Sequence, residues 1–113
     1  IINNRPEGES EDQVAGADIA AAAQALGISY AAIPITHAGF SQHQIEAMQS
    51  ALTSASGKVL AYCRSGTRST LLWALVQSKQ GADLDMIANT AADAGYDVSS
   101  IKPLMDMLKA QSA

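Results

Sequence analysis

The sequence predicts an α/β domain in which a mostly parallel sheet is flanked by helices. Short apolar segments alternate with longer helical segments along the 113 residues, which is the order that a parallel sheet requires. Glycine-containing polar segments fall between them, where turns are expected. The length fits a single domain, residues 1–113, and 48% apolar residues suffice for a modest core.

The first three predicted elements are a strand, a helix and a strand. Ile1 and Ile2 resemble the end of a strand, so we expect the N-terminal part of the sheet to lie before residue 1. Residues 14–26 are rich in alanine and predict a helix, which Gly27 is placed to end. Residues 29–35 predict a strand. The buried face of the helix is predicted at Ile19, Ala22, Ala23 and Leu26.

The next helix and strand lead to the only cysteine. Ser41 and Gln44 form a capping box, which predicts a helix start, and Gly57 is placed to end that helix. Residues 59–62 are apolar and predict a strand that ends at Cys63. Three more helices are predicted, one from about residue 71 to near residue 81, one over residues 83–94 and one over about residues 100–110.

Composition limits the partners that this chain can have. Eleven acidic and seven basic residues give a net charge of −4, and the basic residues form no stripe, so neither nucleic acid nor an anionic membrane is expected as a partner. A single cysteine excludes an internal disulfide and a multi-cysteine zinc site, and no metal or cofactor is predicted. A reactive single thiol fits the reducing cytoplasm.

The chemistry is concentrated in residues 63–69, Cys-Arg-Ser-Gly-Thr-Arg-Ser, between a predicted strand and a predicted helix. In that geometry the backbone N–H groups of residues 64–68 and the helix N-terminus can form a cradle for an anion. The same dipoles and two arginines would favour the thiolate of Cys63, and a thiolate is the nucleophile of covalent catalysis. A lone cysteine is more often a small buried hydrophobe, but that role needs no arginines or hydroxyls beside it.

Two enzyme families place a cysteine in such a loop. Cysteine-dependent protein phosphatases follow His-Cys-x-x-Gly-x-x-Arg-Ser/Thr, whereas rhodanese sulfurtransferases often follow Cys-Arg-x-Gly-x-Arg/Thr. Arg68 lies five residues after Cys63, as in the rhodanese pattern, and Tyr62 stands where phosphatases have histidine. The Asp-x-Arg and Gly-His-Ile segments of rhodaneses are absent from the sequence. The loop alone therefore favours sulfur transfer, and the remainder of the chain does not add to that case.

The whole chain resembles the beta-lactamase-hydrolase-like protein, phosphatase-like domain family. The resemblance rests on Ile-Asn-Asn-Arg-Pro-Glu-Gly-Glu at residues 2–9, on residues 27–35, on the loop and helix at residues 63–74, and on Ala-Gly-Tyr-Asp at residues 94–97. This bacterial family is similar in fold to dual-specificity and protein tyrosine phosphatases, so the resemblance implies that fold. Some members are fused to a metallo-β-lactamase-like sulfur dioxygenase, which implies a fused or partner domain of that kind.

The resemblance also implies roles for individual residues of the loop. Cys63 would be the nucleophile, and Arg68 would be the guanidinium that binds the anion. Ser69 would be the hydroxyl beside the thiolate, and Gly66 would let the loop turn tightly. The other predicted anion-binding positions of the loop are Arg64, Ser65 and Thr67.

The general acid is the point at which the chain departs from dual-specificity phosphatases. Those enzymes carry an aspartate on the loop after the second strand, and here residues 36–39 contain no carboxylate. His37 could donate the proton instead, or it could be an exposed loop histidine. Arg5 follows the first strand, where α/β sheets usually bind ligands, and could bind the anion or pair with a neighbouring glutamate.

We therefore predict a cysteine-dependent hydrolase that acts on phosphate monoesters through the Cys63 thiolate. A rhodanese-like sulfurtransferase that carries a Cys63 persulfide is the close alternative, and a non-catalytic anion-binding domain is the third. The whole-chain resemblance favours the first, whereas the missing acid and the short loop favour the second. The expected ligand is accordingly a small oxyanion, a phosphorylated substrate or a sulfane-sulfur donor.

Overall fold

The computed structural model describes residues 1–112 and divides into two compact units. The first unit is Ile1–Gly66 and contains all the strands that the structure describes. The second begins at Thr67, and all the regular elements of its described part are helices.

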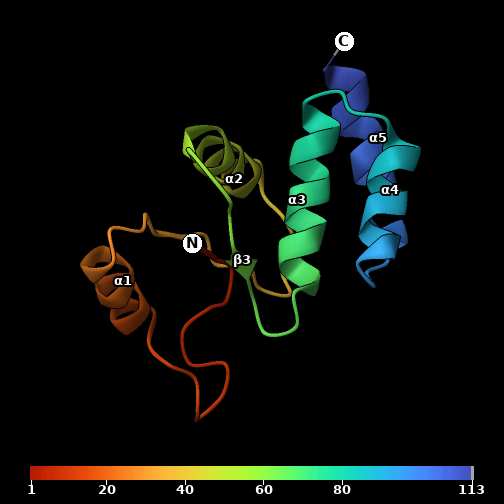
Figure 1. Ribbon diagram of the computed structural model, residues 1–113. Coiled ribbons are helices and arrows are strands. Elements are labelled where there is room, and N and C mark those ends of the chain that lie inside the picture. Colours follow the sequence, from red (N-terminus) through yellow and green to blue (C-terminus); the bar gives the residue numbers. More distant parts are fainter. Residues whose placement is uncertain (113) are drawn as a thin grey trace. The chain divides into compact units, whose positions relative to one another are not determined.

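The first unit is built on a parallel sheet of three short strands, in the order β2-β1-β3. The strands are β1 (Ile2–Asn3), β2 (Ala31–Ala32) and β3 (Ala61–Tyr62), and both pairings are parallel. Helices connect the strands, as parallel pairing demands (Figure 1). The prediction of an α/β fold with a parallel sheet is confirmed.

Backbone hydrogen bonds continue this pairing beyond the strand ends. The N–H of Asn4 donates to the carbonyl of Tyr62 at 2.7 Å, and the N–H of Ile35 donates to the carbonyl of Asn4 at 2.9 Å. The fully buried side chain of Asn4 adds a bond from Nδ2 to the carbonyl of Ile33 at 2.9 Å. These bonds fix the carboxyl ends of the three strands, where the candidate site lies.

Helix α1 (Gly16–Ala25) lies between β1 and β2 in the chain, and its predicted face is only partly right. Ala23 is buried as predicted, but Leu26 is 76% exposed and Ala22 is also exposed. A helix made largely of alanine has little apolar contrast between its faces, so periodicity placed the buried face poorly. Gly27 ends the helix with φ +71°, as predicted.

Helix α2 (Gln42–Ser54) begins as predicted and ends early. Ser41 accepts from the N–H of Gln44, whose side chain accepts from the N–H of Ser41, which completes the capping box. The chain leaves the helix at Ala55, which is extended, so Gly57 does not end it. The strand predicted over residues 59–62 is likewise reduced to Ala61 and Tyr62.

The second unit consists of α3 (Thr67–Lys79), α4 (Leu84–Asp93), a 3-10 turn η1 (Ser99–Ile101) and α5 (Lys102–Gln111). Helix α3 contacts both α4 and α5, and the three lie side by side in Figure 1. Helix α3 begins before the predicted apolar run, directly after Gly66. Its fully buried side chains include Leu72, Ala74, Leu75 and Val76.

The ends of α4 and α5 follow the predicted signals. Asp83 caps α4 by accepting from the N–H of Met86 at 3.1 Å, and Gly95 follows the helix with φ +93°. Pro103 occupies the first turn of α5, where its missing N–H costs no helical hydrogen bond. Within residues 1–112, no helix is both long and apolar enough to span a bilayer.

Candidate active site

The candidate site lies at the carboxyl ends of the strands in the first unit. Asn4 and Arg5 follow β1 there, and Cys63 and Arg64 follow β3. In open parallel sheets, this edge is where ligands bind. The chain therefore places its only cysteine at the edge of the sheet at which ligands are expected.

Cys63 is 8% exposed and is the first residue after β3. Three residues later the chain turns back, so that the N–H of Gly66 donates to the sulfur of Cys63 at 3.1 Å. Gly66 adopts φ +90°, a conformation that glycine reaches without the steric cost of a side chain. A backbone donor aimed at the sulfur favours the thiolate over the thiol.

The remaining loop residues divide between the two units. Arg64 and Ser65 are exposed and belong to the first unit together with Cys63 and Gly66. The predicted anion-binding and catalytic residues Thr67, Arg68 and Ser69 form the first turn of α3, in the second unit. Ser69 is 5% exposed, and Arg68 is half-buried.

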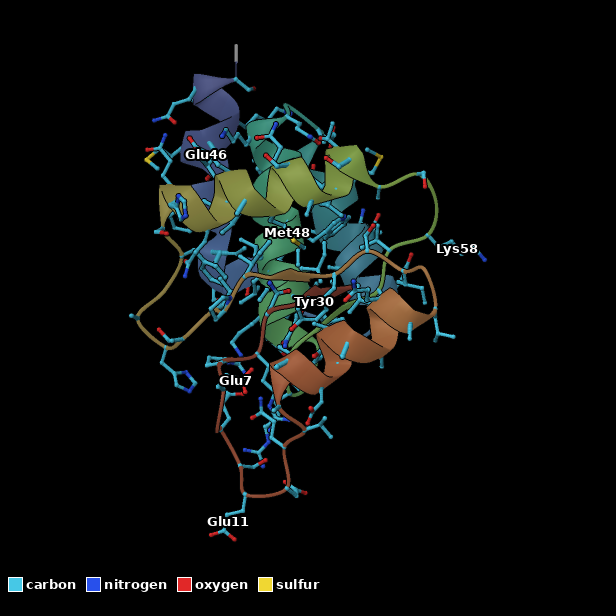
Figure 2. All side chains as sticks on the ribbon, turned by 90° about the vertical axis from the view of Figure 1, so that its left-hand side faces the viewer. Glu7, Glu11, Tyr30, Glu46, Met48 and Lys58 are labelled. Carbon is cyan, nitrogen blue, oxygen red and sulfur yellow. The ribbon has the colours of Figure 1, made fainter. Side chains whose placement is uncertain are left out.

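Arg5 holds the loop that follows β1. Its Nε donates to Oε1 of Glu9 at 3.0 Å, and its Nη2 donates to the hydroxyl of Ser10 at 3.0 Å. For Arg5 the sequence left two roles open, binding of the anion and pairing with a neighbouring glutamate. The structure shows the pairing, with Glu9. Figure 2 shows Glu11 at the tip of this loop and Glu7 nearer the strands.

His37 is exposed in the loop beyond β2, at the same edge of the sheet as Cys63. The adjoining Thr36 accepts from the N–H of Ala38 at 3.2 Å, which makes a tight turn. Because residues 36–39 contain no carboxylate, His37 is the titratable side chain that this loop offers to a leaving group.

Sequence reasoning missed a polar cluster beneath this edge, formed by Asn3, Glu7, Gly16, Tyr30 and Tyr62. Asn3 Nδ2 donates to the hydroxyl of Tyr30 at 3.0 Å, and Glu7 Oε1 accepts from the N–H of Gly16 at 2.8 Å. A Cβ on Gly16 would collide with the Glu7 carboxylate and would lie in tight contact with the Tyr30 hydroxyl. The signal in the sequence was Asn3-Asn4, two amides in line with an apolar strand.

The Tyr62 hydroxyl lies in the same region, buried and without a hydrogen-bond partner among the described residues. Burial, together with Tyr30 and Glu7, raises the pKa of Tyr62 above its ordinary value of 10.0. The phenol therefore stays protonated at physiological pH.

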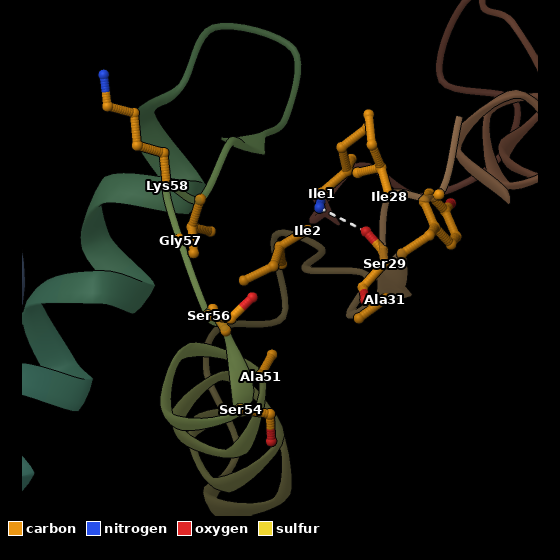
Figure 3. Close-up of a pocket in the computed structure, with 14 residues that line it drawn as sticks. Ile1, Ile2, Ile28, Ser29, Ala31, Ala51, Ser54, Ser56, Gly57 and Lys58 are labelled. Carbon is orange, nitrogen blue, oxygen red and sulfur yellow. Dashed lines mark hydrogen bonds between the residues drawn. The ribbon is translucent and has the colours of Figure 1, made fainter. Parts of the chain in front are cut away.

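A pocket also lies at the opposite, amino ends of the strands, and few of its lining side chains are reactive. It has a volume of about 440 Å³ and is lined by residues such as Ile1, Ile28, Ala51 and Val59 (Figure 3). The backbone nitrogen of Ile1 donates to the carbonyl of Ser29 at 2.7 Å across one wall. Lys58 is its one charged side chain, so this pocket contains no acid–base or nucleophilic pair.

Metal ligands do not gather anywhere in the described chain. Residues 1–112 contain no group of three or more histidine, cysteine, aspartate or glutamate side chains placed to hold a metal ion.

The hydrogen bond to sulfur leads to a first prediction, on the alkylation of Cys63. We expect the pH midpoint of alkylation by iodoacetamide to lie below about 8.5, the value for a free cysteine, because the Gly66 N–H stabilises the thiolate. The measurement is the rate of mass gain as a function of pH, with free cysteine as the control. A midpoint at or above the control would contradict a thiolate-stabilising loop.

Solved structures that resemble this chain are described as candidate phosphatases. One from Neisseria meningitidis Z2491 is 31% identical and superimposes with a TM-score of 0.80, covering 95% of this chain and 76% of that one. Another, from Shewanella putrefaciens CN-32, is 25% identical with a TM-score of 0.66 and covers 99% of this chain and 73% of that one. These neighbours agree with the predicted protein-tyrosine-phosphatase-like fold.

Curated relatives are longer proteins named beta-lactamase hydrolase-like protein. The one from Xylella fastidiosa is 37% identical over 81 residues, and the one from Agrobacterium fabrum is 36% identical over 81 residues. The match covers 72% of this chain but only 19% of each relative, so the chain spans about a fifth of their length. The family model described as "Beta-lactamase hydrolase-like protein, phosphatase-like domain" matches residues 1–80. On these matches, the chain belongs to the beta-lactamase hydrolase-like protein, phosphatase-like domain family.

Proposed function

We propose that this domain hydrolyses phosphate monoesters through a covalent intermediate on Cys63. The observation that carries the proposal is the loop after β3, in which the N–H of Gly66 donates to the Cys63 sulfur. A buried thiolate held by backbone dipoles at the ligand-binding edge of a parallel sheet is equipped for nucleophilic attack. The phosphatase-like family supports phosphorus as the target of that attack.

In the first step, the Cys63 thiolate attacks phosphorus while the ester oxygen leaves with its bonding electrons. The product is an alcohol or phenol, once a proton reaches that oxygen, and a phosphocysteine. In the second step, water attacks phosphorus, which releases inorganic phosphate and restores the thiolate. Backbone N–H groups of residues 64–68 and the guanidinium of Arg68 are proposed to hold the equatorial oxygens. The hydroxyl of Ser69 is proposed to donate a hydrogen bond to the departing Cys63 thiolate.

A second candidate function is sulfur transfer, and the spacing of the loop favours it. Arg68 follows Cys63 by five residues, as in rhodaneses, and residues 36–39 lack a carboxylic acid. In this reaction the thiolate attacks the sulfane sulfur of thiosulfate, forming a persulfide and releasing sulfite. An acceptor thiolate then takes that sulfur and frees the Cys63 thiolate. Sulfite is a stable anion, so the reaction needs no general acid.

One experiment distinguishes the two chemistries before any kinetics. The domain is incubated with thiosulfate or with an aryl phosphate, quenched in acid and analysed by mass spectrometry of the peptide that contains Cys63. A phosphocysteine supports hydrolysis, and a persulfide supports sulfur transfer. A peptide that stays unmodified with both reagents, while product accumulates, argues against a covalent intermediate on Cys63.

Anion affinity gives a second prediction, on Arg68. We expect Arg68→Lys to weaken the binding of inorganic phosphate, because a point charge cannot reproduce the two parallel hydrogen bonds of a guanidinium. The expected loss is about tenfold in affinity, measured by isothermal titration calorimetry. Lys58→Arg, in the exposed segment before β3, is the control. Equal affinity in the Arg68→Lys and parent proteins would remove Arg68 from the site.

The setting of the domain is also part of the proposal. The curated relatives are about five times longer than the matched segment, and their name refers to β-lactamase hydrolases. We propose that the domain works in the cytoplasm beside a metallo-β-lactamase-like domain, fused or separate. A reducing compartment would keep the single thiol of Cys63 available for reaction.

A further inference from the structure

A second pocket lies on the first unit beside the cysteine loop and shares Arg64 with the anion-binding loop proposed above. It has a volume of about 410 Å³, and its walls come from the loop after β1, from α1 and from the residues on either side of Cys63. Cys63 itself is not among the lining residues. Its lining side chains include Arg5, Ser10, Asp12, Val14 and Arg64. We call it the Asp12–Arg64 pocket.

The wall that carries Asp12 is built by hydrogen bonds. Arg5 donates to Ser10, and the Ser10 hydroxyl donates to Oδ1 of Asp12 at 2.7 Å, so the carboxylate is held in place. Gln13 closes the loop, because its Nε2 donates to the carbonyl of Pro6 at 2.9 Å and its Oε1 accepts from the N–H of Glu9 at 2.9 Å. The pocket is therefore organised before any ligand arrives.

The charged groups of the pocket are an Arg5–Glu9 ion pair, the carboxylate of Asp12 and the guanidinium of Arg64, and the last two attract each other without forming an ion pair. Arg5 already forms an ion pair with Glu9, with 3.0 Å between Nε of Arg5 and Oε1 of Glu9. The hydrogen bond from Ser10 lowers the pKa of Asp12 below 3.8, and nearby Arg5 and Arg64 add to this, so Asp12 is ionised at physiological pH. Arg64 is exposed, and among residues 1–112 its side chain forms no hydrogen bond or ion pair.

We propose that the Asp12–Arg64 pocket binds the zwitterionic end of a small molecule, an ammonium and a carboxylate on one carbon. The carboxylate lies toward Arg64 and the ammonium toward Asp12. A simple anion would meet the Asp12 carboxylate, and a simple cation would meet Arg64, so a ligand with both charges is the best electrostatic match. Val14 is 59% exposed and offers an apolar wall for a short side chain.

The Asp12–Arg64 pocket lies next to Cys63 in the chain. Tyr62 and Arg64 line it, and Cys63 lies between them in the chain. A bound amino acid group would therefore sit next to the loop that carries the candidate nucleophile. The binding itself does not depend on the chemistry of Cys63 and can be tested without turnover.

The test compares three probes that share the same propyl chain. L-Norvaline carries both charges, pentanoate lacks the ammonium, and butylamine lacks the carboxylate. Binding is followed by NMR, through the backbone amide signals of Arg5, of residues 7–14 and of Arg64, in the parent domain and in Cys63→Ser. We expect norvaline to bind about fivefold more tightly than either singly charged probe, since each lost charge removes one exposed ion pair.

Two variants should lose this preference in complementary ways. Asp12→Asn should bind norvaline and pentanoate equally well and butylamine more weakly. Arg64→Gln should bind norvaline and butylamine equally well and pentanoate more weakly. Asp18→Asn, an exposed carboxylate on α1 outside the pocket, is the control and should keep the preference of the parent. Three probes of equal affinity, or no shift at residues 5–14 with norvaline, would overturn the proposal. Neither result bears on the proposed catalytic activity of Cys63, because the experiment measures binding and not turnover.

Discussion

Cys63→Ser should abolish turnover of both aryl phosphates and thiosulfate, with a loss on the order of 10,000-fold or more in kcat. A free thiol titrates near pH 8.5, so the loop can hold it as an anion, whereas a serine hydroxyl stays protonated in the same place. The exchange alters the sulfur atom alone and leaves the donors of the loop in position. The measurements are phenolate release from p-nitrophenyl phosphate and sulfite release from thiosulfate.

Anion binding is the control for this variant. Cys63→Ser should still bind inorganic phosphate, because the backbone N–H groups and Arg68 that are proposed to hold the anion are unchanged. Retained binding with lost turnover assigns the chemistry to the sulfur atom. A Cys63→Ser protein with full activity on every substrate would refute both mechanisms and leave only the anion-binding domain.

The fold class could be predicted because its signals are local. Alternating apolar and helical segments implied parallel strands, and the structure shows both strand pairs parallel. Helix starts with a side-chain cap were placed within a residue, as Ser41 and Asp83 show. Capping depends on three or four neighbouring residues, so one sequence contains the whole interaction.

Strand lengths and helix faces could not be predicted in the same way. Val59 and Leu60 are apolar but 38% and 64% exposed, and only Ala61 and Tyr62 are in register with β1, so hydropathy did not place the start of β3. Leu26 was assigned to a buried face on periodicity, although nothing in α1 fixes which side of an alanine helix turns inward. These features depend on residues distant in the sequence.

Where the motif of the candidate site is contiguous, the sequence and the structure describe the same loop. Cys63 and Gly66 are three residues apart, and the structure joins them through one hydrogen bond. Arg5 was left between two roles, and only the folded loop shows it bound to Glu9 and Ser10. Asp12 and Arg64 are far apart in the chain, so their shared pocket was invisible before folding.

His37→Ala should slow alkyl phosphates by roughly 100- to 10,000-fold if the domain hydrolyses phosphate esters. The leaving alkoxide needs a proton, and His37 is the titratable side chain of the loop beyond β2. Aryl phosphates with good leaving groups need that proton less and should be nearly unaffected. His43→Ala, which removes the exposed histidine on α2, is the matched control and should leave both rates unchanged.

The same variant gives the opposite result if the domain transfers sulfur. Sulfite leaves thiosulfate as a stable anion, so His37→Ala should leave transfer to a thiol acceptor almost unchanged. The decisive measurement is therefore a ratio, the kcat/KM of His37→Ala over that of the parent, on an alkyl phosphate, an aryl phosphate and thiosulfate. A large loss on the alkyl phosphate alone assigns His37 as the general acid of a phosphatase. Equal ratios on all three substrates would show that His37 is only an exposed loop residue, and the loop spacing would then favour sulfur transfer.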